Sequence, residues 1–212
     1  MIRSFGILVT LAALLTGCTG HTPHPGDAID TNNKEELVLK SIVVLQSGHD
    51  LAEQGNKGAT TRSLDEGTKA LNTIIAEHFA TRDNVTVLSA MKQESLTGTF
   101  IGTPSTRARP IGTQAKANAV LITRLIAYRE LTGKKYGADE PASVSFDYSL
   151  IHVASGNILC KGSYEETQKT LFSDILSFGK ASKRKFKFVS AATLLREGVE
   201  LKFDACRYLA TQ

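Results

Sequence analysis

The sequence has no tryptophan, only three cysteines and five prolines, and little excess of charge of either sign. With 42% hydrophobic and 22% charged residues, its composition is that of a folded globular chain rather than of a disordered one. The formal net charge of +4 at pH 7 is too small to indicate a polyanionic partner. We therefore expect no nucleic-acid binding.

The sequence also lacks the short motifs that indicate common catalytic or nucleotide-binding sites. It has no Gly-x-Ser-x-Gly elbow, no complete phosphate-binding loop and no dinucleotide fingerprint. Glu165 and Glu166 are adjacent on an expected strand and so point to opposite faces, which excludes them as an acid/base couple. None of the five histidines has metal-ligand spacing, and His78 is expected to be a hydrogen-bonded core residue on the apolar face of its helix. The sequence therefore predicts no catalytic residues, no metal site and no cofactor.

The first residues have the order of an export signal. Arg3 gives a positive start, residues 5–15 are mostly apolar, and the run is too short to span a membrane. Leu15-Thr16-Gly17-Cys18 then resembles the lipobox of bacterial lipoproteins, in which the signal is cut before the cysteine and the thiol carries lipid. This predicts a signal peptide over residues 1–17, lipidation at Cys18 and membrane attachment through that lipid. Because Thr19 is not the aspartate associated with inner-membrane retention, we expect an outer-membrane anchor that faces the periplasm.

Residues 18–33 have almost no apolar periodicity and contain Pro23, Pro25 and Gly26, so they are expected to form a flexible tether. Residues 34–212 are then long enough for a single α/β domain. Two cysteines remain in that domain, Cys160 in a strand-like run and Cys206 in the last helix. An oxidising envelope permits a disulfide between them, and two buried free thiols are the equal alternative.

Periodicity predicts a mixed sheet with helices packed on it. Strands are expected over 37–46 and 85–88, and helices over 63–80, where Ser63 and Glu66 would form a capping box, and over 89–96. Residues 100–112 are expected to be irregular, and 113–118 to form a brief helix. Three antiparallel strands over 119–131, 142–154 and 158–166 form a meander, with a loop at 134–141. Ser190 should cap the final helix. The fold class is therefore α/β (α+β), as a single domain.

A dense basic run precedes that helix. It consists of Lys180, Lys183, Arg184, Lys185 and Lys187. A solvated loop is the plainer interpretation, and a contact with anionic headgroups or an acidic partner is the functional one.

Several motifs carry a resemblance to a known superfamily. They are the segments 117–122, 143–147 and 152–159, the last with the turn Ser155-Gly156-Asn157. They resemble the envelope lipoproteins that include curli secretion channel subunits and penicillin-binding-protein activators, whose core is like the N-terminal domain of the Tol-Pal translocation protein. Segments 140–144, 164–168 and 196–198 resemble uncharacterised lipoproteins of delta-proteobacteria.

The resemblance implies a non-enzymatic, lipid-anchored periplasmic module that binds another envelope protein or assembles with itself. An enzyme that acts on the cell wall or on lipids, with an unrecognised active site, is the alternative. Such an enzyme would need a deep cleft with convergent titratable residues, whereas a binding module would present an exposed patch.

Overall fold

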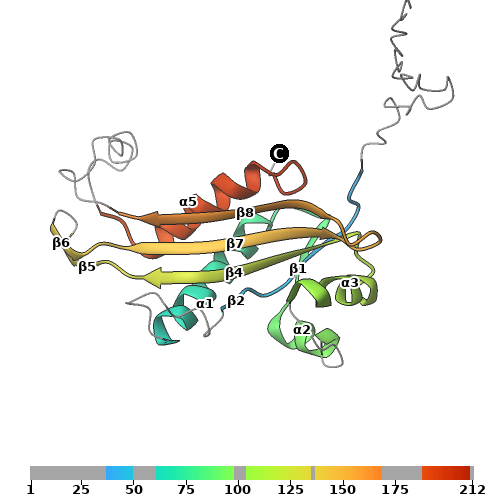
Figure 1. Cartoon of the computed structure of the whole chain (residues 1–212), viewed down its shortest axis with the longest axis horizontal. Helices are drawn as coiled ribbons and strands as arrows, with labels where there is room; N and C mark the ends of the chain where they lie inside the picture. The colour runs from blue at the N-terminus through green and yellow to red at the C-terminus, as the bar shows by residue number, and fades with distance from the viewer. Residues whose placement is uncertain (1–36, 50–60, 98–103, 135–136, 169–187, 211–212) are drawn as a thin grey trace, which may run out of the picture. The chain divides into compact units, whose positions relative to one another are not determined.

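Three long antiparallel strands dominate the sheet: β4 (Ala119–Arg129), β7 (Ser143–His152) and β8 (Ile158–Thr167). The computed structural model describes residues 37–49, 61–97, 104–134, 137–168 and 188–210 (Figure 1). Two short strands, β1 (Ile42–Val44) and β3 (Val85–Val87), extend the sheet in the order β3-β1-β4-β7-β8. β1 pairs with both β3 and β4 in parallel, so the sheet is mixed. The predicted fold class, one α+β domain with an antiparallel meander, is confirmed.

The middle strand of the meander explains why the sheet has two different faces. From Ser143 to Leu150 of β7, the buried Val144, Phe146, Tyr148 and Leu150 alternate with partly exposed polar side chains. This is the period of two that the sequence predicts, because successive side chains of a strand point to opposite faces.

Two helices cover one face, which we call the covered face. They are α1 (Thr61–His78) and α5 (Ala191–Asp204), and they also contact each other (Figure 1). Each crosses the sheet at a glycine. A Cβ added at Gly67 would lie 2.5 Å from the ring of Tyr128, and one at Gly198 would lie 2.4 Å from the ring of Tyr164. Both helices therefore approach the strands more closely than any side chain would allow.

The opposite face is covered at one end only. There α3 (Pro104–Gln114) packs on β4 and β7, and α2 (Ala90–Thr97) packs on α3. Ala108 and Ile111 of α3 bury Val120 and Ile151 in a second, smaller core. The rest of this face carries no helix among the described residues.

The α3 helix corrects the expectation for residues 100–112. The sequence there contains Pro104 and Pro110, which favour an irregular segment, yet residues 104–114 are helical. Pro104 is the first residue of the helix, where a missing N–H costs little. Burial of Ala108 and Ile111 then stabilises the helix despite Pro110. The brief helix expected over 113–118 is also wrong, because α3 ends at Gln114 and β4 begins at Ala119.

Three smaller expectations also change. The strand expected over 37–46 is shorter, and a separate β2 (Gly48–His49) pairs with β4. The loop expected at 134–141 lies partly in a two-stranded hairpin of β5 (Thr132–Lys134) and β6 (Gly137–Glu140). Helix α1 begins at Thr61, so Ser63 lies inside its first turn rather than at the cap. In contrast, the cap at Ser190 is confirmed, since its side chain accepts a hydrogen bond from the Thr193 amide.

Candidate functional site

The first candidate surface is the half of the sheet that no helix of the described residues covers, and we call it the open face. Its polar side chains come from three neighbouring strands: Arg124, Arg129, Ser143, Ser145, Asp147, Ser149, Lys161, Ser163, Glu165 and Thr167. The register aligns them in rows across the strands, for example Arg124 beside Asp147 and Asp147 beside Ser163. All of these polar side chains are partly or fully exposed. The apolar Ile122 and Ala127 lie in the same rows, beside Ser149 and Ser145.

An ion pair lies at the centre of the open face. Nη2 of Arg124 is 2.8 Å from Oδ2 of Asp147, and each side chain is 35% exposed. At one end, Ser143 and Thr167 share a hydrogen bond of 2.6 Å, and Nε of Arg129 donates to the Pro141 carbonyl. Hydroxyl groups and charges of both signs are therefore held side by side on three hydrogen-bonded strands. Such a surface can form hydrogen bonds with a protein partner.

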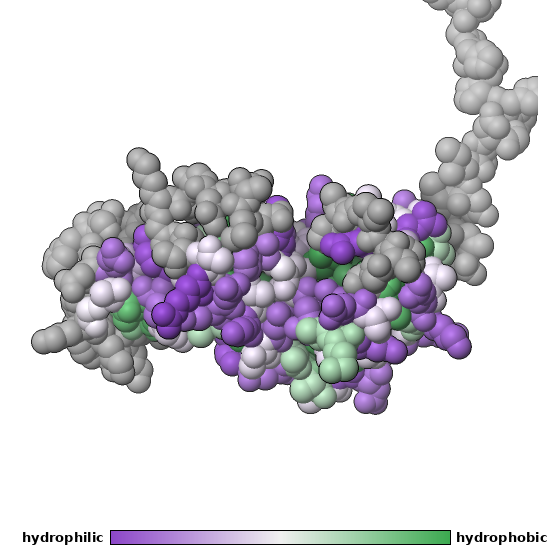
Figure 2. Space-filling view, turned by 90° about the horizontal axis from the view of Figure 1, so that it is seen from below, coloured by the Kyte–Doolittle hydropathy of each residue, from purple (hydrophilic) through white to green (hydrophobic). Residues whose placement is uncertain are grey.

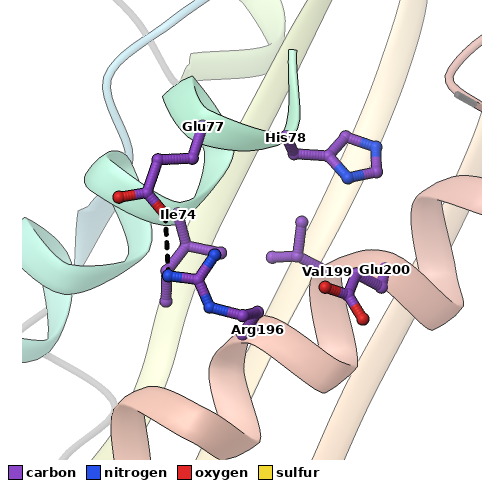
Figure 3. Close-up of a pocket in the computed structure, with 6 residues that line it drawn as sticks. All are labelled: Ile74, Glu77, His78, Arg196, Val199 and Glu200. Atoms are coloured by element: carbon purple, nitrogen blue, oxygen red, sulfur yellow. Dashed lines mark hydrogen bonds and ion pairs between the residues drawn. The ribbon is translucent and has the colours of Figure 1, made fainter. Parts of the chain in front are cut away.

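A pocket of about 160 Å³ lies between the two helices of the covered face (Figure 3). Glu77 and His78 reach it from α1, and Arg196 and Glu200 reach it from α5. Nη2 of Arg196 is 2.7 Å from Oε2 of Glu77, so these two of its four ionisable side chains form an ion pair, and Glu200 and His78 complete the polar lining. Ligand pockets are usually about 300–1,000 Å³, which makes this one small for a substrate.

His78 lies at the edge of this pocket, with its ring pointing away from the ion pair (Figure 3). It is only half-buried, it packs edge-on against Phe79 and Phe203, and its Nε2 has no hydrogen-bond partner among the described residues. Burial lowers the pKa of His78 below its ordinary value, and nearby carboxylates, first that of Asp204, offset part of this effect. The expected hydrogen bond is therefore present, to the backbone of Leu209, and His78 packs against aromatic rings as a half-buried residue rather than a fully buried one.

A third polar group lies between β2 and α1. Nε2 of His49 is 2.9 Å from Oδ1 of Asp65, and the amide of Ser47 donates to Oδ1 of Asn72 over 2.7 Å. The hydroxyl of Ser47 is hydrogen-bonded to that of Thr123. Because Ser47 is engaged by Thr123, the structure shows no serine–histidine pair here. These bonds fix β2 to the helix.

The two cysteines of the domain lie together. Cys160 of β8 and Cys206, in the turn after α5, are joined by a disulfide with a Cα–Cα distance of 6.1 Å. This covalent link attaches the last strand of the sheet to the helix that covers it.

The basic run, with Lys180, Lys183, Arg184, Lys185 and Lys187, lies outside the described residues, as does Cys18. The described residues on either side of the run nevertheless meet. The Val189 amide donates to Oε1 of Gln168 over 3.2 Å, and the Ala191 amide donates to Oε1 of Glu130 over 3.0 Å. The chain therefore leaves and re-enters the domain at one corner, where β4 and β8 end.

The sequence predicted part of the open face. The alternation of serines with apolar residues along 143–150 is the signal for a strand with one exposed face. The sequence did not show that Arg124, Lys161 and Glu165 extend the same surface, since strand register decides which side chains become neighbours.

Viewed from below, the described surface is mostly hydrophilic, with hydrophobic residues in separate patches (Figure 2).

No protein-family model matches the sequence, and no curated protein matches it either. Among solved structures, the chain is similar to a PelC dodecamer subunit from Paraburkholderia phytofirmans, with 14% identity, a TM-score of 0.43, and coverage of 82% of this chain and 89% of that one. It is similar to the C-terminal domain of LpoB from Salmonella enterica, with 15% identity, a TM-score of 0.39, and coverage of 63% and 87%. It is also similar to the lipoprotein GNA1162 from Neisseria meningitidis, with 16% identity, a TM-score of 0.41, and coverage of 68% and 94%.

Proposed function

We propose that this protein is a non-enzymatic, lipid-anchored binding module of the bacterial envelope, which faces the periplasm and binds another envelope protein through its open face. The lipobox at Cys18 supports the anchor and the outer-membrane location. The observation that carries the binding role is the half-covered sheet. A rigid surface of hydroxyls and charges is left uncovered by the helices of the described residues.

The geometry of the open face suits recognition rather than chemistry. Its side chains project from three hydrogen-bonded strands, so little backbone conformational entropy is lost when a partner docks. Arg124 and Asp147 are one-third exposed and can exchange part of their mutual interaction for contacts with a partner. An envelope enzyme would instead need free acids and bases in a cleft, and in the α1–α5 pocket Glu77 and Arg196 are engaged with each other.

Site-specific photo-crosslinking in intact cells tests the surface. A photo-reactive amino acid at Ser145, in the middle of the open face, is expected to give a discrete adduct that mass spectrometry identifies as an envelope protein. The same amino acid at Ala76, exposed on α1, is the matched control and should give none. If the two positions yield the same adducts, the open face is not the binding surface.

The anchor is tested by the variant Cys18→Ala. Among the described residues, no helix has the length and apolar character needed to span a membrane. Because the lipid is the proposed anchor, its loss should move the variant from the membrane fraction to the soluble periplasmic fraction. Wild-type protein should begin with an acylated cysteine by mass spectrometry. Unchanged membrane partition of the variant would contradict the proposal.

The basic run provides a second contact in this proposal, because both of its flanks are fixed at the corner where β4 and β8 end. Changing Lys183, Arg184 and Lys185 together to glutamine should reduce recovery of the partner and leave folding nearly unchanged. Added salt should weaken the wild-type complex, since exposed charges are screened over about 8–10 Å. If the variant recovers the partner as well as wild type at every salt concentration, the run is an ordinary solvated loop.

A further inference from the structure

The outer edge of β8 is available for pairing. β8 is the last strand in the sheet order, and no strand of the described residues pairs with its outer side. Its backbone N–H and C=O groups on that side therefore offer a template for another strand. Three exposed side chains of the open face follow one another along this edge: Lys161, Ser163 and Glu165.

These three side chains are self-complementary. In an antiparallel pair of identical strands centred on Ser163, Lys161 of each copy faces Glu165 of the other, and the two Ser163 residues face each other. Such a pairing is two-fold symmetric, so every favourable contact occurs twice. We propose that two copies of this chain associate through their β8 edges in this register and form one continuous sheet. The inference concerns the edge and stands apart from the partner of the open face.

Helix α5 supplies a second, independent observation. Leu201 is a large apolar side chain, yet it is 59% exposed. An α-helix turns about 100° per residue, and Gly198 faces β8. Around the axis of α5, Leu201 lies about 60° to one side of Gly198. Phe203 lies about 140° to the other side, toward α1. Leu201 therefore lies on the flank of α5 that faces away from α1, toward the free edge of β8.

Leu201 also lies at the level of the proposed axis. Gly198 lies against Tyr164, and Cys206 is bonded to Cys160, so α5 runs antiparallel to β8 between these two contacts. A helix rises about 1.5 Å per residue and a strand about 3.3 Å, so one step along β8 corresponds to about two along α5. Ser163 is thus beside residues 200–201, and the symmetric pairing brings Leu201 opposite its own copy.

The spacing of the helices fits this arrangement. In an antiparallel pair with a two-fold axis perpendicular to the sheet, the α5 helices of both copies lie on the same side. α5 lies over β7 and β8, since the Tyr148 hydroxyl donates to the Lys202 carbonyl and Tyr164 lies under Gly198. The two α5 axes are then about two strand spacings apart, ~10 Å, which is within the usual distance of packed helices.

Cysteine crosslinking in the full-length chain, in intact cells, tests the register. The variant Ser163→Cys should give a disulfide-linked dimer under mild oxidation, because facing residues of antiparallel strands lie about 4.5–5.5 Å apart, which a disulfide can span. Ser145→Cys, on the same face but one strand further in, is the matched control and should remain monomeric. Intact mass should show that the Cys160–Cys206 bridge is retained in both variants.

Charge exchange tests whether the dimer uses the proposed contacts. In the Ser163→Cys background, Lys161→Glu and Glu165→Lys should each reduce crosslinking on the order of tenfold, because each places two like-charged pairs at the interface. The double exchange should restore it, and Leu201→Asp should reduce it. Failure of Ser163→Cys to crosslink, equal crosslinking of Ser145→Cys, or no restoration by the double exchange would each overturn the proposal. None of these results would alter the photo-crosslink at Ser145, so the two proposals fail separately.

Discussion

The two faces of the sheet are built from the same three strands and differ in what covers them. On the covered face, Tyr128 and Tyr164 each lie under a helix glycine, and the hydroxyl of each donates a hydrogen bond to a glutamate two residues further along the chain. On the open face, the central contact is a one-third exposed ion pair between Arg124 and Asp147. Packing is therefore concentrated on one side of the molecule and hydrogen-bonding capacity on the other.

The covered face should therefore determine stability, and the open face should determine binding. Close packing of helix on strand contributes most where it excludes water, and exposed ion pairs contribute little. Changes on the covered face should therefore alter the free energy of unfolding. Changes on the open face should alter association and leave folding nearly intact, and four measurements can break or sharpen this contrast.

The disulfide on the covered side should give the largest effect. Replacing Cys160 and Cys206 together by alanine is expected to lower the free energy of unfolding by about 4 kcal/mol, because the bridge closes a loop with a sequence separation of 46 residues. Urea denaturation of wild type and of the variant measures the difference. Mass analysis of non-reduced, alkylated wild-type protein must first show a bridge, and two alkylated thiols would contradict the pairing.

The glycine at the crossing of α5 should come next. In Gly198→Ala the added Cβ would lie 2.4 Å from the ring of Tyr164. This overpacking should lower the free energy of unfolding by about 2 kcal/mol. Helix propensity alone predicts the opposite sign, a gain of about 1 kcal/mol. Ser149→Ala on the open face is the control and should change stability by less than about 0.5 kcal/mol. A stabilised Gly198→Ala variant would show that the helix is free to move away.

Tyr128 should make the stability of the covered face depend on pH in the alkaline range. Burial, followed by the charge of Glu130 and the hydrogen bond to it, raises the pKa of Tyr128 to about 12. The folded-state pKa exceeds the ordinary value of 10, so the protonated Tyr128 side chain contributes to the stability of the folded state. This contribution is complete below pH 10 and is lost as the pH rises toward 12. The stability advantage of wild type over Tyr128→Phe should therefore shrink across that interval. An advantage that is the same at pH 9 and near pH 12 would refute this assignment.

The ion pair of the open face should give the smallest effect. A double-mutant cycle with Arg124→Ala and Asp147→Ala is expected to show a coupling below about 1 kcal/mol that decreases with added salt. Urea denaturation of the four proteins at low and high salt measures it. A salt-independent coupling of several kcal/mol would make the open face a structural element and remove the contrast.

Much of the fold could be predicted because its signals are local. The alternation along 143–150 indicates one buried and one exposed face, and Ser190 marks the start of the last helix. The error at 104–114 is equally informative. Two prolines argue against a helix, and only the burial of Ala108 and Ile111 against Val120 explains why one forms. A sequence does not show which apolar surface will be available to bury a marginal helix.

The sequence by itself determined the strands of the meander, the amphipathic helices and the prediction of a lipidated Cys18, because periodicity and short motifs are properties of neighbouring residues. Only the tertiary structure decided which face of the sheet remains open, which strand is left at its edge, and that Cys160 meets Cys206. These depend on register and on the placement of helices far apart in the chain. Long-range packing assigns Lys161 and Glu165 to one exposed edge, where no local pattern could place them.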